Sequence, residues 1–114
     1  MEDCIFCKIV NGEIPSEKVY EDDKVLAFKD INPEAPVHVV IIPKKHISSI
    51  NEVTAEDELL LGHIFTVAKE IAAKLGVSEN GYRVVSNCGK DAGQTVPHIH
   101  FHMLAGRVLG WPPC

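Results

Sequence analysis

The segment Pro97–Leu104 constrains the fold of this chain more than any other stretch of its sequence. It reads PHIHFHML, so that His98, His100 and His102 alternate with apolar residues at a period of two. Because successive side chains of a strand point to opposite faces, we predict a strand over residues 98–104. Its three imidazoles would share one face, each about 6.7 Å from the next. The apolar side chains between them would point into the core.

Three imidazoles in a row need an explanation, because each buried ring nitrogen requires a partner. One interpretation is a solvated strand face with a chance excess of histidine. The complete alternation argues against it. A second interpretation is a three-histidine metal site, since histidines at positions i and i+2 can bind zinc. The triad alone does not exclude that second interpretation.

The rest of the chain is predicted to form a small α+β domain. Apolar positions recur at helical spacing after Thr54, a good N-cap residue, and Gly76 marks the end of that helix. Asp3 and Gly12 bound a short first helix in the same way. The predicted helices cover residues 4–11 and 54–75, and the predicted strands cover residues 18–21, 25–29, 37–42, 82–87 and 98–104. Hairpin-like connections and a single long helix favour an antiparallel sheet of about five strands.

Length and charge limit the classes of function. The 114 residues suffice for a single domain spanning residues 1–114. The formal net charge of −5 argues against a nucleic-acid polymer or a membrane surface as partner, because both bind clustered positive charge. No apolar run approaches the roughly 20 residues of a membrane span, and residues 1–4 lack the features of a signal peptide. We therefore expect a cytoplasmic protein whose four cysteines are free thiols or metal ligands.

Several segments together resemble one known family. Residues 98–104 fit the pattern His-φ-His-φ-His-φ-φ, where φ is apolar, at every position. The similarity extends to Ile5-Phe6, Leu26–Ile31, Ile42–Ile47, Asn87–Thr95, Gly106-Arg107 and Trp111–Pro113. On these residues the chain resembles the histidine triad (HIT) superfamily, and its ending resembles the Hint branch of nucleotide-binding phosphoramidases.

The resemblance implies a HIT-like α+β fold and a homodimer built by the long helix and the strand that begins at Tyr82. It also implies hydrolysis of the P–N bond of purine nucleoside 5′-phosphoramidates through a nucleotidyl-histidine, with no catalytic metal. His100 would be the nucleophile, which splits one difficult displacement into two easier ones. His102 would contact the phosphate and protonate the leaving amine, and His38 would support the imidazole network. Thr95 stands where the family usually carries Ser.

The resemblance further implies a site for a purine nucleoside monophosphate or phosphoramidate. Asp30 would bind the ribose, because a carboxylate can accept hydrogen bonds from both hydroxyls. The base would lie in an apolar slot formed by Phe6, Ile9, Phe28 and Ile31. The phosphate would contact the main-chain N–H groups of Gly93 and Gln94 and the rings of His100 and His102. Asn87 would contact the phosphate or the ribose, and the hydroxyl of Thr95 would contact the phosphate or the leaving group.

The cysteine pair Cys4-x-x-Cys7 also has a counterpart in the family. Many bacterial members bind structural zinc through such a pair together with the positions of His46 and His98 here. The resemblance therefore implies a closed Cys₂His₂ site, and the alternative is a pair of packed free thiols. Cys88 and Cys114 are expected to be free, and His63 is expected at the surface or the core edge.

Three other functions remain open alongside the phosphoramidase. One is a nucleotide-binding regulatory module whose hydrolysis is incidental. Another is a dinucleoside polyphosphate hydrolase, which the Trp111-Pro112-Pro113 ending disfavours. The third is a zinc-dependent hydrolase in which the triad histidines ligate the metal.

Overall fold

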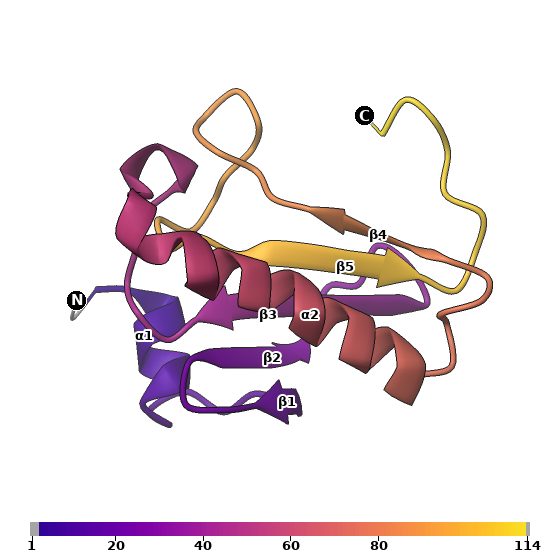
Figure 1. Ribbon diagram of the computed structural model, residues 1–114, viewed down its shortest axis with the longest axis horizontal. Helices are drawn as coiled ribbons and strands as arrows, with labels where there is room; N and C mark the ends of the chain where they lie inside the picture. The colour runs from indigo at the N-terminus through magenta and orange to yellow at the C-terminus, as the bar shows by residue number, and fades with distance from the viewer. Residues whose placement is uncertain (1–2, 114) are drawn as a thin grey trace.

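The computed structural model describes residues 3–113 and confirms an α+β fold (Figure 1). The helices are α1 (Ile5–Val10) and α2 (Glu58–Lys74), with two 3₁₀ turns, η1 (Ile50–Glu52) and η2 (Ala55–Asp57), before α2. The strands are β1 (Lys18–Glu21), β2 (Val25–Lys29), β3 (Val37–Pro43), β4 (Tyr82–Val85) and β5 (Phe101–Ala105). They form one sheet in the order β1-β2-β3-β5-β4, and every neighbouring pair is antiparallel.

The two faces of the sheet carry separate apolar clusters. α2 runs across one face (Figure 1), where Ile64, Val67 and Ile71 pack with Ile41 and Met103. On the other face, α1 covers the side chains of β2 and β3 that point away from α2. That second cluster contains Cys4, Phe6, Ile9, Leu26, Phe28, Val40 and Ile42. Its face is the one that carries the histidines, because His102 pairs with Val40 in the β3–β5 ladder.

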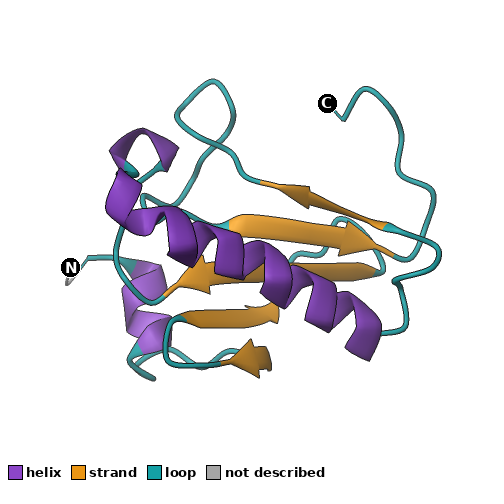
Figure 2. Cartoon of the chain, viewed as in Figure 1, coloured by secondary structure: helices purple, strands orange, loops and turns teal. Residues whose placement is uncertain are grey.

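The last strand begins later than the sequence predicts. β5 starts at Phe101, so His98 and His100 lie in the irregular segment that precedes it (Figure 2). The β3–β5 pairing reaches Ile41 opposite Phe101 and stops. Two residues further along β3, Pro43 has no N–H to continue a ladder. The predicted inward side of the segment is nevertheless confirmed, because Ile99, Phe101 and Met103 are buried in the α2-side core.

The helix starts also differ from the predictions. Cys4, not Asp3, caps α1, and its Sγ accepts a hydrogen bond from the N–H of Cys7 at 3.3 Å. The Cys4 side chain is buried at the point where α1 begins. α2 begins at Glu58 because Thr54 caps the 3₁₀ turn η2 in a capping box with Asp57.

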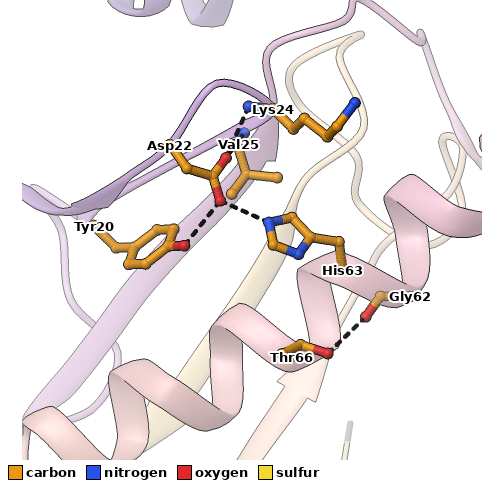
Figure 3. Close-up of polar contacts among 7 residues, drawn as sticks. All are labelled: Tyr20, Asp22, Lys24, Val25, Gly62, His63 and Thr66. Atoms are coloured by element: carbon orange, nitrogen blue, oxygen red, sulfur yellow. Dashed lines mark hydrogen bonds and ion pairs between the residues drawn. The ribbon is translucent and has the colours of Figure 1, made fainter.

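A polar cluster joins α2 to the β1–β2 turn (Figure 3). Asp22 Oδ1 accepts hydrogen bonds from the N–H groups of Lys24 and Val25, at 2.7 and 2.8 Å. Asp22 Oδ2 accepts a hydrogen bond from the Tyr20 hydroxyl at 2.8 Å and lies 2.6 Å from His63 Nε2. His63 therefore has a structural role at the core edge. No helix within residues 3–113 has both the length and the apolar character needed to cross a membrane.

Candidate active site and metal-binding site

A cavity of about 260 Å³ lies between α1 and the histidine-bearing face of the sheet. Most of the predicted nucleotide-binding residues line it. These are Phe6, Ile9, Phe28, Asp30, Ile31, Thr95, His100 and His102. Its walls are mostly apolar, and the polar groups gather where the segment before β5 meets the end of β2. This composition is typical of a small-molecule site, in which apolar walls surround a few polar groups.

His100 is held in one tautomer. Its side chain is nearly buried, with 5% of the residue exposed, and its Nδ1 lies 2.8 Å from the carbonyl oxygen of His98. A carbonyl can only accept a hydrogen bond, so Nδ1 carries a hydrogen, and in the neutral ring Nε2 then keeps its lone pair. The Phe6 ring packs edge-on against the imidazole, with centroids 5.0 Å apart. A neutral imidazole in this orientation offers a nucleophilic nitrogen to the cavity.

A pair of imidazoles, those of His38 and His102, lies beside His100. His38 Nε2 is 2.9 Å from His102 Nδ1 and 3.4 Å from Asp30 Oδ2. Burial lowers the pKa of His102, the neighbouring His100 and His38 lower it further, and Asp30 opposes them. These effects favour the neutral form of His102, which keeps one ring hydrogen to donate. The structure thus brings His38 into contact with a triad histidine.

Only some of the residues predicted to contact the phosphate from the loop before the triad line the cavity. Thr95 lines it, whereas Asn87, Gly93 and Gln94 do not. The N–H of Gly93 donates to Lys90 O at 3.0 Å, and the N–H of Gln94 donates to Gly89 O at 3.1 Å. The expectation that these two N–H groups face a phosphate is therefore wrong for this conformation. They close the loop on itself, because Gly93 adopts a turn with φ of +82°.

The three triad histidines do not form a common ligand set. His98 is fully buried, and its Nε2 lies 2.8 Å from the carbonyl oxygen of Pro43. Its Nδ1 faces Cys4 Sγ at 3.3 Å, whereas His100 turns to a main-chain carbonyl and His102 turns to His38. Each ring serves a different partner, so the interpretation of a metal site made by all three histidines is contradicted.

The four predicted metal ligands come together from three distant segments. Cys4 Sγ, Cys7 Sγ, His46 Nδ1 and His98 Nδ1 all lie within 4.8 Å of one another. The two imidazole nitrogens are 3.2 Å apart, and each has a cysteine sulfur at 3.3 Å. Tetrahedral zinc, with bonds of about 2.0–2.3 Å to nitrogen and sulfur, separates its ligand atoms by about 3.3–3.8 Å. The donor set therefore fits a zinc ion.

The electrostatics of the cysteine pair point the same way. Burial, a hydrogen bond with Cys4 and the charge of Cys4 together raise the pKa of the Cys7 thiol to about 11. The Cys7 thiol can ionise near neutral pH only if a cation compensates its charge. An open cavity of about 690 Å³, lined by Cys7, His46 and Lys44 among others, connects this cluster to solvent. Cys88 is free as expected, and Cys114 lies outside the described residues.

The structure also shows contacts at the site that the sequence did not indicate. The Ser86 hydroxyl donates to the carbonyl oxygen of His100 at 2.8 Å, just beyond the end of β4. The main-chain N–H of Glu34 donates to His38 Nδ1 at 3.0 Å. Main-chain groups carry no signal in a sequence. For Ser86, the only available signal was a hydroxyl residue at the end of a predicted strand.

Comparisons with known proteins identify the family of this chain. The HIT domain family matches residues 11–109. A purine nucleoside phosphoramidase of Escherichia coli is 51% identical over 109 residues, covering 96% of this chain and 92% of that protein. An uncharacterized HIT-like protein of Synechocystis is 54% identical over 112 residues, covering 98% of this chain and 97% of that protein.

Solved structures show the same relationship in three dimensions. A HIT family hydrolase from Legionella pneumophila superposes with a TM-score of 0.97 at 53% identity, covering 98% of this chain and 100% of that one. A histidine triad protein from Clostridium difficile gives a TM-score of 0.94 at 52% identity, with 96% of each chain covered. The family match, the sequence identities and the matching fold together place this chain in the histidine triad (HIT) family of hydrolases.

Proposed function

We propose that this protein is a purine nucleoside phosphoramidase, which cleaves the P–N bond of a nucleoside 5′-phosphoramidate. The orientation of His100 is the observation that supports this proposal most strongly. Its Nδ1–H is directed at the His98 carbonyl, which leaves Nε2 as an unprotonated nucleophile at the cavity. The relative named purine nucleoside phosphoramidase, 51% identical over nearly the whole chain, supports the same reaction.

In the proposed reaction, His100 Nε2 attacks phosphorus, and the bond from phosphorus to the leaving nitrogen breaks. His102, which lines the same cavity, donates its ring proton to the leaving nitrogen while a proton from solvent restores the neutral imidazole, and the nitrogen departs as an amine. Water then attacks the nucleotidyl-histidine, gives up a proton to solvent and releases a nucleoside 5′-monophosphate and free His100. The covalent intermediate divides the displacement into two steps at one nucleophile.

The remaining cavity residues would bind the nucleoside. Phe6 and Phe28, whose ring centroids are 5.8 Å apart in an edge-to-face arrangement, would form walls for the base. Asp30 would accept hydrogen bonds from the ribose hydroxyls. One of its oxygens already accepts from the N–H of Asn32 at 2.8 Å, but each carboxylate oxygen has a further lone pair. The Thr95 hydroxyl would contact the phosphate or the leaving group.

A structural zinc ion is also part of this proposal. Cys4, Cys7, His46 and His98 would hold it and so link α1 to the segment before β5. The metal would supply a fixed charge and coordinate bonds that hold these segments together. Its effect on catalysis would be indirect, because His98 contributes the carbonyl that orients His100.

We further propose that the protein is a homodimer formed through α2 and β4. Leu59 and Phe65 on α2 are 91% and 54% exposed, which is unusual for two large apolar side chains on one helix. β4 is an edge strand, and three of its four residues are half-buried. A partner at this edge would cover both features.

The test of the phosphoramidase activity is amine release from adenosine 5′-phosphoramidate by wild-type protein and the His100→Ala variant. We expect the wild type to turn over and the variant to lose at least about 10³-fold in kcat. Rapid quench and mass spectrometry of the wild type should trap a nucleotidyl adduct on His100. Turnover by His100→Ala at the wild-type rate would refute the proposal.

The same assay separates the alternative functions. Diadenosine tetraphosphate cleaved faster than the phosphoramidate would indicate the dinucleoside polyphosphate hydrolase instead. AMP binding without turnover would indicate a regulatory module. The assay is also repeated after metal removal with a chelator. Circular dichroism recorded in parallel then distinguishes a loss of activity from a loss of the fold, because the cysteine cluster is expected to stabilise α1.

A further inference from the structure

The loop between β2 and β3 controls the protonation pattern of His38. The main-chain N–H of Glu34 donates to His38 Nδ1 at 3.0 Å. A peptide N–H can only donate, so this ring nitrogen must hold a lone pair. Neutral His38 therefore carries its hydrogen on Nε2. His38 is nearly buried, so water does not compete freely for the same nitrogen.

The tautomer of His38 in turn affects the tautomer of His102 in the triad. His38 Nε2–H lies 2.9 Å from His102 Nδ1 and donates to it. His102 Nδ1 is then an acceptor, so the hydrogen of neutral His102 is on Nε2, the ring nitrogen left to face the cavity. The opposite tautomer of His102 would set two N–H groups against each other at this distance. This main-chain amide, together with the Asp30 carboxylate 3.4 Å from His38 Nε2, thus favours Nε2 as the nitrogen of His102 that can donate.

The segment after β5 holds that amide in place. Arg107 Nη2 donates to the carbonyl oxygen of Glu34 at 3.1 Å. Gly106 packs on the same loop with φ of +96°, and a Cβ at this position would lie 2.8 Å from Cβ of Pro36. Two consecutive residues, 106 and 107, therefore hold the loop just C-terminal to the Glu34 N–H.

We propose that the main-chain N–H of Glu34, held by Gly106 and Arg107, is a positioning group that keeps His38 and His102 in their Nε2–H tautomers. Its catalytic consequence rests on the proposed phosphoramidase function. With Nε2–H fixed, His102 presents a hydrogen to the phosphate or the leaving nitrogen. With the hydrogen on Nδ1, it would present a lone pair to phosphate oxygens, which would repel it.

The arrangement also argues against metal binding at a neighbouring group. Asp30, His38 and His102 bring ligand atoms within 4.8 Å of one another, as a cation site would. However, His38 Nε2 cannot ligate a cation while it carries the hydrogen that the Glu34 amide assigns to it. The group functions as a hydrogen-bonded relay as long as that amide donates to Nδ1.

The test compares Glu34→Pro, which removes the N–H, with Glu34→Ala, which keeps it and removes the same side chain. In protein labelled with ¹⁵N-histidine, long-range ¹H–¹⁵N spectra report the tautomer of each imidazole. We expect Nε2–H for His38 and His102 in the wild type and Glu34→Ala. In Glu34→Pro, we expect a mixture of tautomers in both rings. Unchanged tautomers in a folded Glu34→Pro protein would overturn the proposal.

Kinetics provide the second readout. We expect Glu34→Pro to lower kcat by roughly 10- to 100-fold with KM within about twofold, because proton transfer and not binding is affected. Glu34→Ala should stay within about twofold of wild type in both. If Glu34→Pro does not fold, Arg107→Ala decides the question, with mixed tautomers expected and rescue by Arg107→Lys. Wild-type tautomers in Arg107→Ala would then refute the proposal.

The two readouts separate this proposal from the proposed function. If the wild type lacks phosphoramidase activity but the tautomers respond as expected, the proposed function fails and the positioning role stands. If the wild type is active and the tautomers do not respond, the positioning role fails alone.

Discussion

Removal of the Ser86 hydroxyl tests whether the irregular segment around His100 is held by side chains rather than by the sheet. β4 and β5 pair only as far as Val85 opposite His102, so the carbonyl of His100 lies just beyond the ladder. Ser86 Oγ supplies the missing donor to that carbonyl at 2.8 Å. Ser86→Ala removes one hydrogen bond to a half-buried group, which costs about 1 kcal/mol of unfolding free energy.

The effect on catalysis follows from the same bond. If the lost hydrogen bond is worth about 1 kcal/mol in holding His100 in its attacking position, kcat falls about fivefold. Ser86→Thr keeps a hydroxyl and should restore most of both losses, whereas Ser86→Val should behave like Ser86→Ala. Urea denaturation measures the stability, and steady-state turnover of adenosine 5′-phosphoramidate measures kcat. Full kcat in a Ser86→Ala protein with reduced stability would refute the positioning role and leave a purely structural bond.

The other predictions concern stability, metal content and assembly. Burial opposes ionisation of Asp22, but hydrogen bonds from His63, two main-chain N–H groups and Tyr20 outweigh it and lower the pKa of the carboxyl. Its stabilisation is therefore complete above the unfolded pKa of about 3.9 and is lost as pH falls through the folded pKa. Asp22→Asn should cost about 1–3 kcal/mol in urea denaturation at pH 7 and less at pH 3, and an equal cost at both would contradict this. A Cys4→Ser/Cys7→Ser variant should lose bound zinc by elemental analysis while Cys88→Ser retains it; equal zinc in both variants would eliminate the proposed ligation. Phe65→Glu should halve the mass measured by light scattering, and a wild-type monomer would show that the dimer proposal is wrong.

The sequence predicted the elements of this fold well, because local patterns suffice for them. The period-two pattern of residues 98–104 correctly assigned Ile99, Phe101 and Met103 to the core. It failed at the start of the strand, because the end of pairing is set by Pro43 on another strand. The cap of α1 was predicted wrongly for a similar reason. The Cys4 side chain contacts His98, which lies 94 residues away in sequence.

The candidate site was predicted unevenly. The residue types were identified from the family resemblance, and the cavity brings most of them together. The N–H groups of Gly93 and Gln94 were assigned to phosphate, but hydrogen bonds within their own loop engage them. A sequence lists donors and acceptors without stating which of them are already satisfied locally.

The sequence by itself determined the alternation of histidine and apolar residues, and with it the face of the sheet on which chemistry could occur. Only the tertiary structure decided that the three histidines have three different tasks. His98 meets a cysteine pair, His100 meets a carbonyl, and His102 meets His38. Side-chain periodicity is a local property of the backbone, whereas the tautomer of an imidazole depends on partners that folding brings from elsewhere in the chain.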